Sequence, residues 1–231
     1  MNEQLINVLK RYDGFHPVVP FAPGTDKLHL FDFSANNSEI TADLVKDTNA
    51  FTQYVNSTLA EHHSLYGIGG YNENRSLYSR SEVFDDVSAE PRRLHLGIDI
   101  WGKPYTHVMA PVDGIVHSFA FNNAFGDYGA TIILTHQLEG FTFHTLYGHL
   151  SFNSLKNLNE GDTIKRGEVF TEFGIQFENG QWPPHLHFQL IIDMERNKGD
   201  YPGVCKYSER EKYLKNCPDP DLVLRMMRYA T

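Results

Sequence analysis

The chain has 231 residues, of which 41% are apolar, 13% aromatic and 21% charged, as in an ordinary globular protein. Its 29 acidic residues outnumber its 20 lysines and arginines, so the formal net charge is -9. Such a deficit disfavours binding to nucleic-acid phosphates or to an anionic membrane surface. No segment approaches the roughly 20 apolar residues of a membrane-spanning helix. We therefore expect a globular protein whose partners include neither nucleic acid nor membrane.

The N-terminal sequence MNEQLINVLKRYDGFHPVV lacks the basic start, apolar run and cleavage site of a secretory signal. A cytoplasmic location is expected on this basis, and an extracytoplasmic one only if the sequence has been trimmed. Cys205 and Cys217 are expected to be free thiols, with a local disulfide as the alternative. The oligomeric state is left open.

Residues 1–85 are predicted to form a helical and loop region that packs on the core. Apolar residues recur at helical spacing over 2–12, and residues 28–33 alternate like a strand. A second helix begins near Asp47 or Thr48, either of which can serve as its N-cap.

Residues 86–200 are predicted to form a β domain. From about residue 92 to 193 the hydrophobic pattern has a period of two, with β-branched and aromatic runs separated by glycines. The predicted strands include 114–121, 130–136, 141–147 and 185–192. The fold class is therefore expected to be mainly β, a compact antiparallel sheet with helical N- and C-terminal additions.

Residues 201–231 return to helical spacing and form a predicted C-terminal tail. Ser208 and Glu211 have the spacing of a capping box, and Asp219-Pro220 is typical of a second helix start.

Chemistry-bearing residues concentrate in the β region, beginning with LHLGIDI (94–100). Alternation places His95, Gly97 and Asp99 on one face of a strand. In a straight strand the α-carbons of His95 and Asp99 would be about 13 Å apart, too far for one metal ion. A bend at Gly97 would bring them together, whereas the simplest alternative is a structural histidine and a surface aspartate.

A second cluster is HLHFQLII (185–192), where His185, His187 and Gln189 share one face. The two histidines are about 6.6 Å apart, so one can bind a metal while the other faces a substrate. A third candidate, His149, follows a glycine in HTLYGHL, and His136 is a weaker candidate.

Two neutral imidazoles and a carboxylate are a suitable ligand set for a catalytic zinc ion with an open fourth position. Such a site hydrolyses amides or esters, with the other histidines moving protons or stabilising an oxyanion. The sequence contains no H-E-x-x-H helix, G-x-S-x-G turn or P-loop that would indicate a different catalytic mechanism.

The order His95-x-x-x-Asp99, YGHL with His149, and His185-x-His187 resembles the lysostaphin/LytM-type zinc metallopeptidases, which have the duplicated hybrid motif. The resemblance covers about residues 92–193. Framework segments that share it are APVDGIVH (110–117), GDYGATIILTH (126–136), NEGDTIKRG (159–167) and PHLHF (184–188).

The resemblance implies one Zn²⁺ per chain, bound by His95, Asp99 and His187. It implies that His149 and His185 are the catalytic pair, without deciding which of them is the base. The activity implied is that of a zinc metalloendopeptidase, and the implied substrates are peptides or muropeptides from peptidoglycan. Two alternatives remain, a non-catalytic zinc-binding module and a zinc hydrolase of a cytoplasmic amide metabolite.

The approach ENGQWPPHLHF (178–188) is bulkier than the small-residue turn typical of the family. Trp182 can line a pocket or simply pack, and packing is favoured. The segments GIDIWG, LYGHLS and WPPHLHFQ most resemble the version of this domain that lies between kinase-like and aminotransferase domains.

The glycine- and tyrosine-rich segment 66–78 lies outside the resemblance and is predicted to be a loop. It could cover the groove, with Arg75 binding a substrate carboxylate or with Asn72 or Asn74 capping the metal. A connecting loop with a surface arginine is the favoured interpretation.

Overall fold

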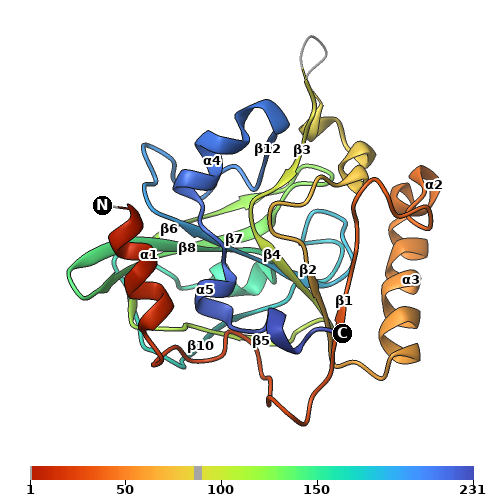
Figure 1. Ribbon diagram of the computed structural model, residues 1–231. Coiled ribbons are helices and arrows are strands. Elements are labelled where there is room, and N and C mark those ends of the chain that lie inside the picture. Colours follow the sequence, from red (N-terminus) through yellow and green to blue (C-terminus); the bar gives the residue numbers. More distant parts are fainter. Residues whose placement is uncertain (1, 86–89) are drawn as a thin grey trace.

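A large twisted sheet forms the centre of the molecule (Figure 1). The computed structural model describes residues 2–85 and 90–231. The sheet has eight strands in the order β1-β2-β4-β11-β8-β7-β6-β9. Their bounds are β1 Leu28–Leu30, β2 Tyr66–Gly69, β4 Ile98–Trp101, β6 Gly114–Asn122, β7 Gly129–Leu138, β8 Phe141–Leu150, β9 Thr163–Ile164 and β11 His185–Ile191. The predicted mainly β fold is confirmed.

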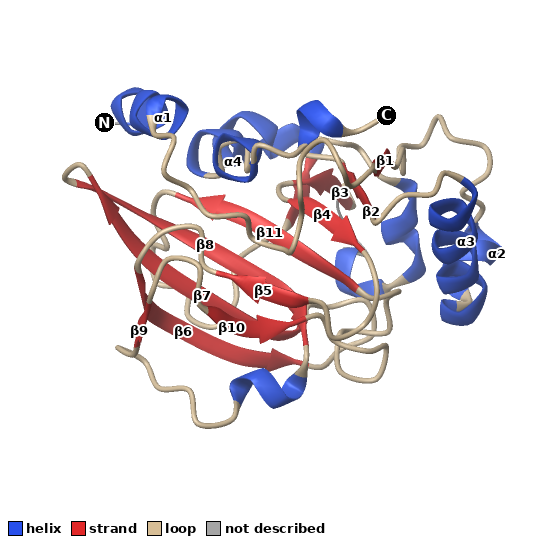
Figure 2. Cartoon of the chain, turned by 90° about the horizontal axis from the view of Figure 1, so that it is seen from below, coloured by secondary structure: helices blue, strands red, loops and turns tan. Residues whose placement is uncertain are grey.

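Two small antiparallel ribbons accompany this sheet, β5 with β10 and β3 with β12 (Figure 2). Their bounds are β3 Arg92–His95, β5 His107–Met109, β10 Val169–Glu172 and β12 Val204–Lys206. Val108 of β5 and Leu134 of β7 belong to the same buried cluster, so the β5–β10 ribbon packs on the large sheet. Because ribbons and helices cover both its faces, β11 is buried along its whole length.

Short helices surround the sheet and come mostly from the two ends of the chain (Figure 2). The α-helices are α1 Asn2–Arg11, α2 Ala42–Lys46, α3 Thr48–Glu61, α4 Arg210–Asn216 and α5 Asp221–Leu224. Single 3₁₀ turns are Ser76–Arg80, Glu82–Phe84, Phe152–Leu155, Tyr207–Glu209 and Met227–Tyr229. Within the described residues, none of the helices is long and apolar enough to cross a bilayer.

Two of the predicted helix caps can be compared with the helix starts in the structure. Asp47 is the N-cap of α3, and its carboxylate accepts from the backbone N–H groups of Asn49 and Ala50. The predicted capping box at Ser208 is wrong, because Ser208 lies within a 3₁₀ turn and α4 begins at Arg210 without a side-chain cap. The backbone N–H of Ser208 instead donates to the carboxylate of Glu90.

The N-terminal region contributes strands as well as helices. β2 pairs antiparallel with β4, and β1 pairs parallel with β2, so the two strands extend the sheet beyond β4. Residues 66–69 are therefore a strand, and the prediction of a loop is wrong there. The alternation is hidden because all four residues of β2 are buried, two of them glycines. This strand carries the chain to the candidate site.

Arg225 joins the two ends of the chain. It adopts a left-handed backbone conformation at the end of α5, with φ of 54°. Its Nη2 donates to the carbonyl oxygens of Leu9, Lys10 and Tyr12, at 2.9–3.1 Å, and so satisfies groups that α1 leaves free at its C-terminus.

We expect Arg225→Ala to lower the free energy of unfolding by about 1–2 kcal/mol, because several carbonyls lose their shared donor. Chemical denaturation monitored by circular dichroism measures this change. Arg11→Ala is the control, since Arg11 forms an exposed ion pair with Glu139 and its loss should cost about 0.5 kcal/mol or less. Equal effects of the two substitutions would contradict the role of Arg225.

Candidate metal centre and active site

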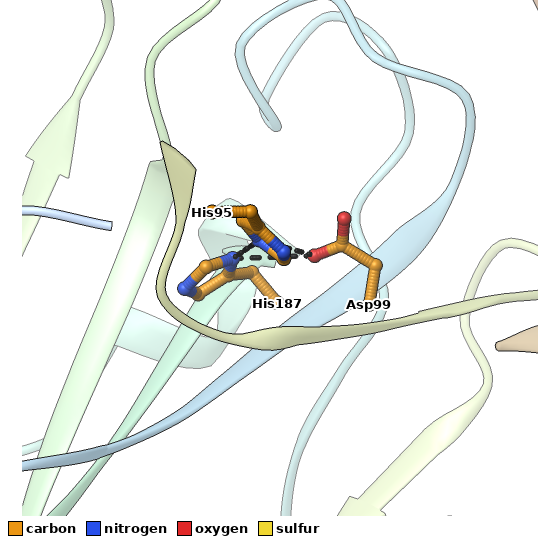
Figure 3. Close-up of side chains that lie close together, drawn as sticks. All are labelled: His95, Asp99 and His187. Atoms are coloured by element: carbon orange, nitrogen blue, oxygen red, sulfur yellow. Dashed lines mark hydrogen bonds and ion pairs between the residues drawn. The ribbon is translucent and has the colours of Figure 1, made fainter. Parts of the chain in front are cut away.

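His95, Asp99 and His187 converge at one point of the sheet (Figure 3). The Nε2 atom of His95 lies 2.9 Å from Nδ1 of His187 and 3.4 Å from Oδ1 of Asp99. The remaining distance, between Nδ1 of His187 and Oδ1 of Asp99, is 3.2 Å. All three side chains are buried. Among the described residues, they form the one group of three or more such side chains with the spacing of a metal site.

Strand register explains how these residues meet. β11 pairs antiparallel with β4 so that His187 lies directly opposite Asp99. The strand is interrupted between β3 and β4, at residues 96 and 97, and this interruption brings His95 to the same point. The predicted bend is therefore present. Glycine is required there because a Cβ on Gly97 would lie 2.5 Å from Cε1 of His187.

Hydrogen bonds determine which nitrogen of each imidazole faces the centre. His95 places Nδ1 3.1 Å from the carbonyl oxygen of Gly70, so Nδ1 carries the proton and Nε2 presents a lone pair. His187 places Nε2 2.9 Å from the amide oxygen of Gln189, so Nδ1 presents the lone pair. Two nitrogen acceptors and a carboxylate oxygen therefore face one another, an arrangement that a cation stabilises.

Gln189 holds this orientation and is fully buried. Its amide nitrogen donates to the carbonyl oxygen of Pro202 at 3.1 Å and to Sγ of Cys217 at 3.3 Å. The Pro202 carbonyl can only accept a hydrogen bond, so the Gln189 atom that faces it must be the amide nitrogen. The Gln189 oxygen must therefore face His187. In the sequence, the alternation of residues 185–192 places Gln189 on the same strand face as His187, and this position indicates its role.

Arg75 is the principal residue that the favoured sequence interpretation placed wrongly. It is 1% exposed, so its assignment to the surface is wrong. Nη1 donates to Oδ2 of Asp99 and to the hydroxyl of Tyr78, and Nε donates to Glu73 at 2.6 Å. Arg75 thus binds the Asp99 oxygen that faces away from the histidines. No local spacing links Arg75 to Asp99, so only the fold reveals the pair.

The asparagines of the same segment do not point to a metal. The side-chain oxygen of Asn72 accepts from Arg210 at 2.8 Å, and Asn74 is exposed. The backbone of this segment instead supports β3, because the N–H of His95 donates to the carbonyl of Glu73 and that of Asn72 donates to the carbonyl of His95.

Burial and neighbouring charges set the ionisation of the centre. Burial lowers the pKa of His95 to about 3, which keeps the imidazole neutral and able to bind a metal. Burial alone would raise the pKa of Asp99, but His95 and the Arg75 guanidinium hold it well below its usual range. Burial also opposes the charge of Arg75, yet Tyr78, Asp99 and Glu73 raise its pKa above the usual value.

His149 and His185 form a second pair beside the centre, with ring centroids 4.1 Å apart. His149 lies 6.3 Å from His187 by the same measure. His149 places Nδ1 2.8 Å from the carbonyl oxygen of Asn179, and His185 places Nδ1 2.8 Å from that of Pro183. Each imidazole therefore keeps Nε2 available as a base.

The environment of this pair favours the neutral imidazoles. Burial lowers the pKa of His185 to about 4, and burial followed by the neighbouring His185 lowers that of His149 well below its usual value. The Trp101 indole stacks on His185 with centroids 3.8 Å apart. His149 has a φ of 62°, a left-handed conformation that is uncommon for histidine and is held by the backbone bond from its N–H to Tyr128.

His136, the weaker candidate, lies elsewhere. Its Nδ1 is 2.9 Å from the carbonyl oxygen of Asp113 and its Nε2 is 2.7 Å from the hydroxyl of Thr145. Both nitrogens are thus used within the sheet, so His136 has a structural role.

Two cavities adjoin the histidines. A larger one of ≈ 140 Å³ is lined by Tyr128, His149, Trp182, Asp200 and their neighbours. A smaller one of ≈ 20 Å³ is lined by Arg75, Leu77, Tyr78, Asp99, Trp101, His149, Trp182, His185 and His187. Trp182, which was expected to pack, is buried and lines both cavities.

The centre fits zinc. Bonds of about 2.0–2.1 Å at tetrahedral angles separate two ligand atoms by about 3.3 Å. The three atoms here are 2.9–3.4 Å apart. The donor set of two neutral imidazoles and one carboxylate is also that of catalytic zinc sites. The two cysteines are free and buried, and Sγ of Cys217 accepts a hydrogen bond from Gln189.

Known structures resemble parts of this fold. The catalytic domain of the antimicrobial peptidase lysostaphin from Staphylococcus simulans is 22% identical, over 70% of this chain and 97% of that one, with a TM-score of 0.42. A zinc-containing peptidase from Vibrio cholerae is 22% identical over 48% of this chain and 31% of its own, with a TM-score of 0.35.

Sequence comparison addresses the family directly. An uncharacterized metalloprotease of Haemophilus influenzae is 34% identical over 102 residues, which are 44% of this chain and 19% of that protein. The chain thus spans about a fifth of that relative's length. Peptidase family M23 matches residues 93–199, a range that contains the two pairs of histidines and Asp99. Residues 93–199 are a domain of peptidase family M23, the lysostaphin/LytM-type family of metallopeptidases.

Proposed function

We propose that this protein is a zinc metalloendopeptidase that hydrolyses peptide bonds, with His95, Asp99 and His187 as zinc ligands. The observation that carries the proposal is the meeting of three buried acceptor atoms beside two imidazoles whose Nε2 atoms are available. A purely structural metal site would need no such second pair.

When bound, zinc would lower the pKa of a water molecule and polarise the carbonyl of the scissile bond. His149 and His185 would supply the proton transfers. One would take a proton from the attacking water and pass it to the nitrogen of the leaving amine as the C–N bond breaks, and the other, in its protonated form, would stabilise the oxyanion. Carbonyl acceptors at both Nδ1 atoms keep the rings in orientation and favour a proton on Nε2 when the imidazole becomes charged. In this geometry, either His149 or His185 can act as the base while the other stabilises the oxyanion.

Peptides or muropeptides of peptidoglycan are the proposed substrates, supported by the family match and by the likeness to an antimicrobial peptidase. A second candidate is hydrolysis of a small amide metabolite. The low exposure of the histidines and the ≈ 140 Å³ cavity beside them favour this candidate. Parallel assays on purified muropeptides and on small amides, monitored by mass spectrometry, distinguish the two.

We expect one zinc per chain in the purified protein and its loss from His187→Ala, because two ligands rarely hold zinc tightly. Elemental mass spectrometry measures the stoichiometry, and hydrolysis should disappear together with the metal. Full zinc retention by the variant would rule out His187 as a ligand.

His149→Ala and His185→Ala should keep zinc but lower kcat by about 10²–10⁴-fold, because each loses a group that transfers or holds a proton. Steady-state kinetics on zinc-loaded protein tests this. His144→Gln is a matched control, since His144 lies on the same strand as His149 but bonds to Thr135. Unchanged turnover in either alanine variant would remove that residue from the catalytic pair.

Gly97→Ala should weaken zinc binding, because the added methyl group would press on the His187 ring. The zinc dissociation constant, measured by competition with a chelator, should rise about tenfold or more. Gly102→Ala is the control: its methyl group would come within 2.7 Å of the Tyr66 ring, away from the ligands. It should lower stability without changing zinc affinity, and the same zinc affinity in both variants would contradict the proposed constraint.

A further inference from the structure

The small cavity beside the metal centre is lined by residues that have buried donors without acceptors. In the part of the chain that the structure describes, few buried side-chain nitrogens have no hydrogen-bond partner. Arg75 Nη2, Trp101 Nε1 and Trp182 Nε1 are among them, and all three residues line this cavity. These atoms can only donate, so the cavity is suited to a group rich in acceptor oxygens.

The three donors come from separate parts of the chain. Arg75 follows β2, Trp101 ends β4, and Trp182 lies in the turn before β11. Each is fixed by other contacts: Arg75 by Asp99 and Glu73, and Trp101 by stacking on His185. Trp182 lies under the guanidinium of Arg80, at 4.4 Å from its ring centroid. The donors are therefore held in place without a ligand, a condition for tight binding at small entropic cost.

Charge distinguishes a carboxylate from a neutral carbonyl group as the occupant. Arg75 contributes one positive charge, and its partners Asp99 and Glu73 contribute one negative charge each. A zinc ion would add two positive charges, so the buried groups together would carry one net positive charge. A substrate carboxylate would neutralise that charge, and a guanidinium recognises carboxylates through directed N–H bonds.

The volume of the small cavity limits the size of the group that it can hold. The cavity volume of ≈ 20 Å³ is roughly the room that one or two water molecules need. A carboxylate group fits this space, but a complete side chain does not. The rest of a substrate would extend into the larger cavity, which shares Tyr78, His149 and Trp182 with the smaller one.

We propose that Arg75, Trp101 and Trp182 form a subsite that binds a carboxylate of the substrate beside the metal centre. The subsite rests on the proposed function through the zinc, whose charge makes the buried groups net positive. Substrates would therefore carry a free carboxylate near the scissile bond. Arg75 is outside residues 93–199, whereas Trp101 and Trp182 are within them, so the N-terminal segment supplies the charged group of the subsite.

The test compares N-acetyl-alanine with N-acetyl-alaninamide, which differ in the carboxylate alone, by isothermal titration calorimetry on zinc-loaded protein. The acid should bind about tenfold more tightly than the amide. The chain has two tryptophans, and both line the cavity, so tryptophan fluorescence should also change with the acid. Equal affinities for acid and amide would overturn the proposal.

Variants separate this subsite from direct binding of the acid to zinc. Trp182→Phe and Trp101→Phe remove one donor each and should weaken acid binding about fivefold, with amide binding unchanged. Arg75→Lys should abolish most of the preference for the acid over the amide. Elemental analysis must show full zinc occupancy of this variant before its affinities are compared. Arg93→Lys is the matched control, because Arg93 pairs with Asp85 away from the cavity. An acid preference that persists in all the tryptophan and Arg75 variants would come from zinc alone and would refute the subsite.

The subsite and the proposed function fail in different ways. Carboxylate preference in a zinc-loaded protein that hydrolyses none of the substrates would refute the proposed function and leave the subsite intact. Hydrolysis without any preference between acids and amides would refute the subsite and leave the function intact.

Discussion

The pairing of β4 with β11 is the constraint on which the rest of the centre depends. It places His187 opposite Asp99 and His185 opposite Trp101, so one register brings together a proposed metal ligand from each strand and the stacked imidazole next to them. A shift of β11 by one residue would turn both of its histidines to the other face of the sheet, away from Asp99 and Trp101. β8 pairs with the other edge of β11 and delivers His149 to the same end. The proposed metal binding and proton transfer therefore depend on three adjacent strands, together with His95 at the end of β3.

Electrostatics explains why this arrangement needs so many outer contacts. Two imidazole lone pairs and a carboxylate oxygen repel one another when brought within 3.4 Å without a cation. The chain resists their separation through Gly70 and Gln189, which hold the two imidazoles, and through Arg75, which holds Asp99. The fold thus positions these atoms without a metal ion. Folding has already met part of the free-energy cost of bringing them together, which a cation would otherwise have to offset on binding.

Much of this could be predicted from sequence, because alternation is a local property. It placed His185, His187 and Gln189 on one face and required a bend between His95 and Asp99, and both features are present. Arg75 and β2 could not be found in this way. The ion pair of Arg75 with Asp99 joins residues 24 positions apart with no shared periodicity, and β2 is too short and too completely buried to alternate. Burial of an arginine depends on tertiary partners, which a single sequence does not display.

The division of the site between two parts of the chain has a consequence for how such enzymes can diversify. The matched residues 93–199 contain the proposed metal ligands, whereas β2 and the segment after it contribute the Gly70 carbonyl, Arg75 and Tyr78. β2 also covers the edge of β4, so the matched residues expressed alone would expose an unpaired strand next to Asp99. Replacement of this one N-terminal segment, with the sheet and its metal left intact, would give an evolving or designed protein a direct means of changing which substrates are accepted.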